Sequence, residues 1–229
     1  MELDRILEDI RNGRPVLIYD SDRRERETDI TISSKFVTHE TIRTMRQDGG
    51  GLICTTLPYS YGKKIGIDYL VDIFIKSGYK IFDYLYPNDI PYDEKSAFSI
   101  TINHRKTFTG ITDNDRSFTI REFYNLLEKA RDMDDTEAMK EFGKNFRSPG
   151  HVHLLLAHDE LLKARRGHTE LSTSLMYMAG MVPSATIVEM MGDDGYSLKK
   201  DLARKYAEKK GIYFIEGSEI IEWWNEWSR

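Results

Sequence analysis

The chain has 229 residues, of which 40% are hydrophobic, and a formal net charge of −5. This composition is typical of a soluble globular protein, and the acidic balance argues against nucleic acid as the main partner. Cys54 is the single cysteine, which excludes an internal disulfide framework, and without a signal peptide or a long apolar run we expect a cytoplasmic protein with no membrane partner.

In the N-terminal half, helical and strand patterns alternate along the chain. Apolar residues three and four apart over 3–10 predict an amphipathic helix that ends at Gly13, before the first strand. Thr38 is placed to cap a second helix, which ends before the three glycines at 49–51. Continuous or alternating apolar residues predict strands at 15–19, 30–33, 52–57 and 96–103, and residues 107–112 are expected to continue the sheet.

In the C-terminal half the same alternation continues. The spacing of Thr119 and Glu122 is that of a capping box, which predicts that a core-facing helix begins there. Thr169 is placed to cap a later helix. Residues 84–94, with two prolines, are expected to be irregular, and the acidic stretch 132–137 to be an exposed connection or helix end. Strands are predicted at 151–157, 185–191 and 212–215, and helices over 198–206 and around the tryptophans at 223, 224 and 227.

No linker, repeat or low-complexity tract divides the chain, so residues 1–229 are predicted to form a single domain. A domain of this length buries a substantial core. The alternation of helices and strands predicts an α/β (α+β) fold, a layered α-β-α sandwich with a mixed sheet.

The most informative segment is 20–29, which places five carboxylates and three guanidiniums in ten residues directly after a buried strand. Carboxylates grouped in this way suit a hard divalent cation, and the arginines suit a phosphate or carboxylate of a substrate. A solvated charged loop is the alternative that this segment alone leaves open. If the loop is extended, its period of two separates the acidic from the basic side chains: Glu25, Glu27 and Asp29 against Arg24 and Arg26.

A second segment, 165–170, reads Arg-Arg-Gly-His-Thr-Glu and precedes a predicted helix. The free backbone N–H groups at a helix start attract an anion, and Arg165 or Arg166 can add a bidentate contact to phosphate. His168 can ligate a metal beside this position. The alternative is that Thr169 is only a cap and that the arginines are surface residues.

Two further residues are candidates for proton transfer. Glu189 lies inside an apolar run, where a carboxylate must be protonated, paired or functional. His151 stands at a strand start, where an imidazole can titrate near neutral pH. A structural pair between Glu189 and an arginine is the alternative. Packing or surface positions are assigned to Cys54, His39, His104, His153 and His158.

Taken together, these segments resemble 3,4-dihydroxy-2-butanone 4-phosphate synthase of riboflavin biosynthesis. The resemblance runs from about residue 3 to about residue 215. Its most specific part is the combination of the acidic, arginine-containing loop with the Arg-x-Gly-His-Thr motif. The matching segments are 19–29, 50–54, 109–112, 147–151 and 165–170, in this order and spacing.

The resemblance implies a lyase that converts D-ribulose 5-phosphate into L-3,4-dihydroxy-2-butanone 4-phosphate and formate. It implies two Mg²⁺ or Mn²⁺ ions per site, no organic cofactor, and a homodimer with sites near the subunit boundary. It also implies a single domain without the GTP cyclohydrolase II domain of some bacterial relatives. Enolisation of a ketose, dehydration and skeletal rearrangement pass through oxyanions such as an enediolate, which a Lewis acid stabilises.

Carried over by motif position, the resemblance also implies the roles of individual residues. Metal ligands are expected at Glu25 and His168, and catalytic residues at His151, Glu189, Glu27 and Asp29. Substrate contacts are expected from Arg24, Glu25, Asp29, Thr112, Arg165, Arg166, Gly167, His168, Thr169 and Glu189. Thr28 is a departure, because many family members have glycine there, which permits backbone angles that threonine resists.

Two other functions remain open at this stage. A divalent-metal sugar-phosphate isomerase or aldolase would use the same residue types and give a different product. A nucleotide- or RNA-binding module would show affinity without turnover and a basic face, which the overall acidity disfavours.

Overall fold

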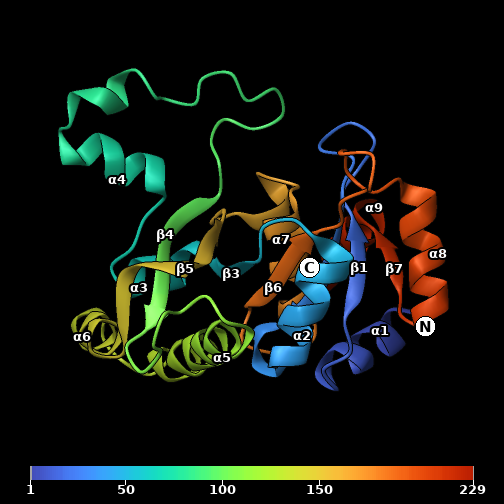
Figure 1. Cartoon of the computed structure of the whole chain (residues 1–229), viewed down its shortest axis with the longest axis horizontal. Coiled ribbons are helices and arrows are strands. Elements are labelled where there is room, and N and C mark those ends of the chain that lie inside the picture. The colour runs from blue at the N-terminus through green and yellow to red at the C-terminus, as the bar shows by residue number, and fades with distance from the viewer. Residues whose placement is uncertain (1, 229) are drawn as a thin grey trace.

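A mixed sheet of seven strands lies at the centre of the structure, a computed structural model that describes residues 2–228 (Figure 1). The strands are β1 (Val16–Tyr19), β2 (Thr28–Ser33), β3 (Cys54–Pro58), β4 (Phe98–His104), β5 (Phe146–Ala157), β6 (Ala185–Glu189) and β7 (Phe214–Glu216). Their order across the sheet is β4-β5-β3-β6-β2-β1-β7. The pairs β3–β5 and β1–β7 are parallel, and the other neighbours are antiparallel.

Helices cover both faces of this sheet (Figure 1), which confirms the predicted layered α/β (α+β) fold. One face carries α1 (Glu2–Arg11), α7 (His168–Met178) and α9 (Gly217–Trp227). The other carries α2 (His39–Thr44), α3 (Tyr59–Lys64), α5 (Asp113–Ala130), α6 (Asp135–Asn145) and α8 (Lys200–Lys210). The short segments are η1 (Ser34–Phe36), η2 (Met45–Gly49), η3 (Lys80–Asp83) and η4 (Leu161–Lys163), and α4 (Leu70–Ser77) lies apart. None of the helices within residues 2–228 combines the length and apolar character needed to cross a membrane.

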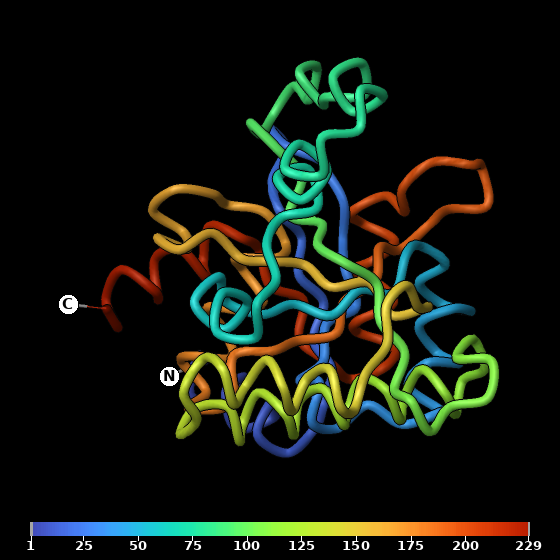
Figure 2. The backbone as a smooth tube through the Cα atoms, turned by 90° about the vertical axis from the view of Figure 1, so that its left-hand side faces the viewer, coloured from blue at the N-terminus to red at the C-terminus, as the bar shows by residue number. Residues whose placement is uncertain are grey.

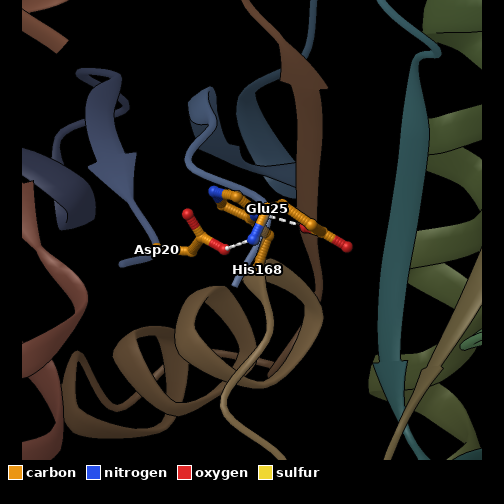
Figure 3. A group of neighbouring side chains, drawn as sticks. All are labelled: Asp20, Glu25 and His168. Atoms are coloured by element: carbon orange, nitrogen blue, oxygen red, sulfur yellow. Dashed lines mark hydrogen bonds and ion pairs between the residues drawn. The ribbon is translucent and has the colours of Figure 1, made fainter. Parts of the chain in front are cut away.

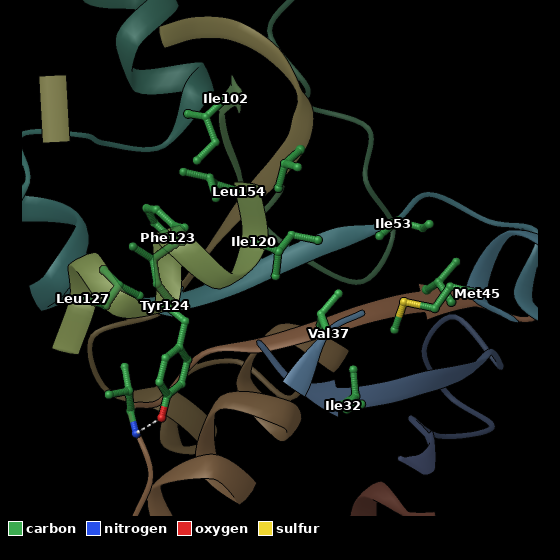
Figure 4. Packing of buried hydrophobic residues seen from close by; sticks show 14 of the residues in the cluster. Ile32, Val37, Met45, Ile53, Ile102, Ile120, Phe123, Tyr124, Leu127 and Leu154 are labelled. Carbon is green, nitrogen blue, oxygen red and sulfur yellow. Dashed lines mark hydrogen bonds between the residues drawn. The ribbon is translucent and has the colours of Figure 1, made fainter. Parts of the chain in front are cut away.

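The core consists of two apolar clusters, one on each face of the sheet. Because neighbouring residues of a strand point to opposite faces, Leu17 of β1 joins the cluster under α5, whereas Ile18 joins the cluster under α7. In Figure 4, Ile120 and Phe123 of α5 lie beside Ile102 of β4 within the first cluster. Each fully buried side chain of this size contributes roughly 1.5–3 kcal/mol to stability.

Several predicted element boundaries are wrong, although the elements exist. Helix α5 begins at Asp113 after the N-cap Thr112, whereas Thr119 lies inside the helix and accepts a hydrogen bond from the backbone N–H of His104 (3.0 Å). Residues 107–112 form an irregular, bent segment and not a strand, and Gly110 within it has a φ of 92°, outside the extended region. Helix α7 begins at His168, two residues earlier than predicted, so Thr169 stands in its first turn and is not its cap.

Residues 70–97 leave the body of the molecule and return to it at β4, as both Figure 1 and Figure 2 show. This segment contains α4, η3 and the predicted irregular section, which the structure confirms as a loop over residues 84–97. Its outer part exposes large apolar side chains such as Tyr79 and Tyr84. Helices α3 and α4 were absent from the sequence prediction.

The pairing of β2 with β6 positions the functional site. Antiparallel register places Asp29, near the start of β2, opposite Glu189 at the end of β6. The acidic loop that joins β1 to β2 therefore lies beside Glu189. His168, in the first turn of α7, meets this same edge of the sheet.

Candidate active site

A cavity of about 110 Å³ lies at this edge of the sheet, between the acidic loop and the start of α7. Apolar side chains including Cys54, Phe98 and Leu155 form one wall. Seven of the predicted site residues line the cavity: Arg24, Glu25, Asp29, Arg165, His168, Thr169 and Glu189. The fold thus brings together three polar segments that are far apart in sequence.

The acidic loop is a compact turn and not extended, so the alternation expected of an extended loop does not apply. The buried carboxylate of Asp20 accepts hydrogen bonds from the backbone N–H groups of Glu25 (2.8 Å) and Glu27 (3.1 Å). Arg26 has a φ of 61°, which an extended strand does not contain. As a result Arg24 and Glu25, neighbours in sequence, both line the cavity.

Glu25 and His168 are in direct contact, although 143 positions separate them (Figure 3). The distance between Nδ1 of His168 and Oε2 of Glu25 is 3.3 Å. Burial acts to lower the pKa of His168, but the charges of Asp29 and Glu25 outweigh it and raise this pKa to about 9. Burial acts to raise the pKa of Glu25, but the contacts with His168 and Arg24 lower it to about 2. Glu25 is therefore an ionised carboxylate at neutral pH.

The chemistry of this donor set suits a hard divalent cation. Ligand atoms of Asp20, Glu25 and His168 all lie within 4.8 Å of one another. Since the oxygens of Asp20 already accept backbone hydrogen bonds, Glu25 and His168 are the more available donors. One carboxylate with one imidazole leaves most positions of a six-coordinate ion to water or substrate oxygens, as Mg²⁺ and Mn²⁺ prefer.

Asp29 is a buried carboxyl group with an unpaired oxygen. Its side chain is 1% exposed, and Oδ1 has no hydrogen-bond partner among the described residues. This oxygen lies 3.6 Å from Nε2 of His168. Burial, assisted by the nearby carboxylates, raises the pKa of Asp29 to about 8. Asp29 is therefore a stronger base than an ordinary aspartate, and its Oδ1 accepts no hydrogen bond from the described residues.

Glu189 is held by backbone, not by an arginine. Its Oε2 accepts a hydrogen bond from the backbone N–H of Leu52 (2.7 Å), and the backbone N–H of Gly51 donates to its carbonyl oxygen (3.0 Å). A Cβ on Gly51 would lie 2.2 Å from Oε2, so only glycine leaves room for this carboxylate. The three glycines before β3 thus fit a close approach to Glu189.

Two arginines border the cavity and share one acidic partner. Nη2 of Arg24 lies 2.5 Å from Oδ2 of Asp93, and Nη2 of Arg165 lies 2.7 Å from the same oxygen. Arg24 also contacts Glu25 (2.7 Å) and Arg165 contacts Glu170 (2.8 Å). These contacts hold both guanidiniums beside the cavity.

The start of α7 provides a favourable electrostatic environment for an anion. The N-cap, Gly167, supplies no side-chain cap, so the first backbone N–H groups depend on other partners. A Cβ on Gly167 would lie 2.7 Å from Nη2 of Arg24. Glycine here therefore lets this guanidinium pack against the helix start.

The remaining predicted site residues do not line the cavity. His151 is exposed on β5, with Nδ1 3.1 Å from Nδ2 of Asn103, and Thr112 and Arg166 are also exposed. The carboxylate of Glu27 accepts a hydrogen bond from the hydroxyl of Ser197 (2.6 Å), while its backbone oxygen lies 3.2 Å from Nε2 of His168. Gly167 is buried beside the cavity as the cap of α7.

Sequence reasoning missed two residues of this region. Asp20 carried a signal, because an aspartate at a strand end followed by a polar turn often accepts backbone hydrogen bonds. No sequence signal pointed to Asp93, since 69 positions separate it from Arg24 and it lies in an irregular segment.

Comparisons with known proteins agree with this arrangement. The family model described as 3,4-dihydroxy-2-butanone 4-phosphate synthase matches residues 4–223. The chain belongs to this family. The enzyme of that name from Methanothermobacter thermautotrophicus is 48% identical over 223 residues, which cover 96% of this chain and 94% of the relative. The one from Archaeoglobus fulgidus is 42% identical over 226 residues, covering 97% and 93%.

The fold of the family is confirmed by a solved structure of 3,4-dihydroxy-2-butanone 4-phosphate synthase in complex with two magnesium ions. It superimposes with a TM-score of 0.71 at 24% identity, covering 95% of this chain and 94% of that chain. At this identity the likeness establishes the fold alone.

Proposed function

We propose that this protein converts D-ribulose 5-phosphate into L-3,4-dihydroxy-2-butanone 4-phosphate and formate, a step of riboflavin biosynthesis. The observation that carries the proposal is the contact of Glu25 with His168 in a cavity also lined by two arginines. Both motifs of the family thus meet at one place. A sugar phosphate fits this site, because its hydroxyls suit the acidic side and its phosphate suits the guanidiniums.

Glu25 and His168 would hold the divalent cation. A bound Mg²⁺ or Mn²⁺, in our proposal two ions per site, supplies Lewis-acid stabilisation of developing oxyanions. The ionised state of Glu25 fits this role. Since imidazole ligates a metal only as the neutral form, His168 would hold the ion in its deprotonated state.

The other cavity residues divide into phosphate binding and proton transfer. Arg24, Arg165 and the start of α7 bind the phosphate. Asp29, whose pKa is raised by burial, carries a proton more readily than an ordinary aspartate and donates it to a leaving hydroxyl. Glu189, oriented by the backbone N–H of Leu52, accepts a proton from a substrate carbon.

A homodimer accounts for the exposed position of His151. Its imidazole and the hydroxyl of Thr112 do not reach the cavity of their own chain, and a second copy can present them to it. Symmetric pairing of two identical chains is the commonest oligomeric arrangement. We therefore include a site shared between two subunits in the proposal.

Product analysis tests the proposed function. Purified protein with Mg²⁺ and ¹³C-labelled ribulose 5-phosphate should yield one formate and one four-carbon phosphate per substrate consumed, and a chelator should stop the reaction. Carbon-resolved NMR identifies both products. A five-carbon product would indicate an isomerase and a reversible cleavage would indicate an aldolase; either result refutes the proposal.

A further inference from the structure

Asp93 occupies the position between Arg24 and Arg165 that an anionic ligand would be expected to take. Its Oδ2 lies 2.5 Å from Nη2 of Arg24, and 2.9 Å and 2.7 Å from Nε and Nη2 of Arg165. The side chain of Asp93 is 9% exposed, as is that of Arg24. A single carboxylate oxygen therefore bridges two largely buried guanidiniums.

The charges around the two guanidiniums are already balanced without Asp93. Arg24 has Glu25 at 2.7 Å and Asp20 at 3.6 Å, and Arg165 has Glu170 at 2.8 Å. A dianionic phosphate brought beside Asp93 would meet a like charge at short range. Phosphate and Asp93 therefore exclude each other from the arginine pair.

The segment that carries Asp93 is suited to move. Residues 84–95 contain no helix or strand, and most of their side chains are exposed. Besides Asp93, the segment contacts the site through Tyr92, whose ring lies 4.9 Å from the guanidinium of Arg24. Lys95, two residues after Asp93, anchors the C-terminal end of the segment through Asp72 (2.8 Å). A separate hollow of about 300 Å³, lined by Asp93 and Arg165 among others, leaves room for its displacement.

We propose that Asp93 is an internal anion that competes with the phosphate of the substrate for Arg24 and Arg165. In the absence of substrate the loop 84–95 closes over the arginines, and binding of the phosphate displaces it. The loop thereby lowers the affinity for every phosphate-bearing ligand and favours those that bind both arginines at once. This inference rests on the proposed function, because it assigns the two arginines to phosphate.

The first experiment compares wild-type protein with Asp93→Asn in formate release and in competitive inhibition by inorganic phosphate. Asparagine keeps the shape and removes the charge. Because apparent affinity scales with the fraction of open sites, we expect KM and the inhibition constant of phosphate to fall at least about fivefold, with kcat changed less than about twofold. Glu94→Gln, an exposed neighbour, removes the same charge and should leave all three constants unchanged.

An unchanged or raised KM in Asp93→Asn would overturn the proposal, and a raised KM with a lowered kcat would identify Asp93 as a positioning residue for the arginines.

Hydrogen exchange gives an independent readout on wild-type protein. Saturating inorganic phosphate should accelerate exchange of the backbone amides in 84–95, whereas slower or equal exchange contradicts displacement. Should wild-type protein release no formate, the proposed function fails, and calorimetry of phosphate binding to both proteins still decides the role of Asp93.

Discussion

Gly51 determines how closely the backbone before β3 approaches Glu189. The carboxylate of Glu189 receives its hydrogen bond from Leu52, the next residue, and a Cβ at position 51 would overlap its Oε2. The placement of the proposed base thus depends on a residue without a side chain. Its neighbour Gly50 has a φ of 95°, which only glycine adopts readily.

Gly51→Ala should reduce activity more than stability. Displacement of a catalytic group by about 1 Å costs on the order of a hundredfold in rate, whereas overpacking costs roughly 1–3 kcal/mol in the free energy of unfolding. We expect kcat to fall at least about tenfold in formate assays. Gly143→Ala is the matched control: a Cβ there meets open space within α6, so stability should rise by about 0.5–1 kcal/mol with kcat unchanged. Equal kcat in both variants would contradict this role of Gly51.

Individual residues were predictable where a motif carries the chemistry. The resemblance to the family implied Glu25 and His168 as metal ligands, and the structure places them in contact. Asp93 could not be named, because its partners come from distant segments. Glu27 does not line the cavity, and its carboxylate bonds Ser197 instead. Asp20 holds the loop as a turn, which the alternation of charges does not reveal.

Among the elements, β2 shows why threonine is acceptable at position 28. Thr28 is the first residue of β2, buried and paired with Tyr19. The positive φ of this loop falls at Arg26 instead. The turn thus does not need glycine at position 28.

Helix starts were the least predictable boundaries. Thr112 and Thr119 are both residue types that favour the N-cap position. Thr112 is the N-cap of α5, and the hydroxyl of Thr119 accepts a hydrogen bond from the backbone N–H of His104 in β4. Gly167 replaces Thr169 as the cap of α7. Tertiary contacts decide which of two possible N-cap residues begins a helix, and these contacts cannot be read from the local sequence.

Strand β4 ends in a buried histidine that makes stability depend on pH. His104 is 3% exposed and packs edge-on against Phe118 and Phe146. Burial lowers its pKa below the usual 6.5. As the pH falls below 6.5, His104 takes up a proton in the unfolded chain before it does so in the folded chain. The stability that neutral His104 contributes above pH 6.5 is therefore lost as the pH falls to the lower pKa of the folded state.

The contribution of His104 to the free energy of unfolding should therefore fall between pH 7.5 and pH 5.5. Because the raised pKa values of Asp29 and His168 act in the opposite direction, the measured quantity is the difference between wild type and His104→Asn, which retains an acceptor for the backbone N–H of Lys106. In denaturant titrations this difference should shift against the wild type as the pH falls, whereas His39→Gln, at an exposed position, should keep the pH dependence of the wild type. An identical pH dependence in wild type and His104→Asn would contradict the assignment to His104.

At the scale of the whole molecule, the fold class followed from the alternation of helical and strand patterns. The order of the strands did not, because it depends on pairings such as β3 with β5 that join distant segments. The same limit applies to His151. Its motif predicts a catalytic role, but only the structure shows it exposed and away from the cavity.

The most direct test of the account is formate release by Glu25→Gln and His151→Asn, assayed separately and after mixing. Each variant alone should lose nearly all activity, since one lacks a proposed metal ligand and the other the proposed shared imidazole. Random exchange of subunits restores one intact site in half of the dimers, so the mixture should recover about a quarter of wild-type activity. Wild-type activity in Glu25→Gln alone, or no recovery on mixing, would contradict a site built from Glu25 and His168 of one copy and His151 of the other.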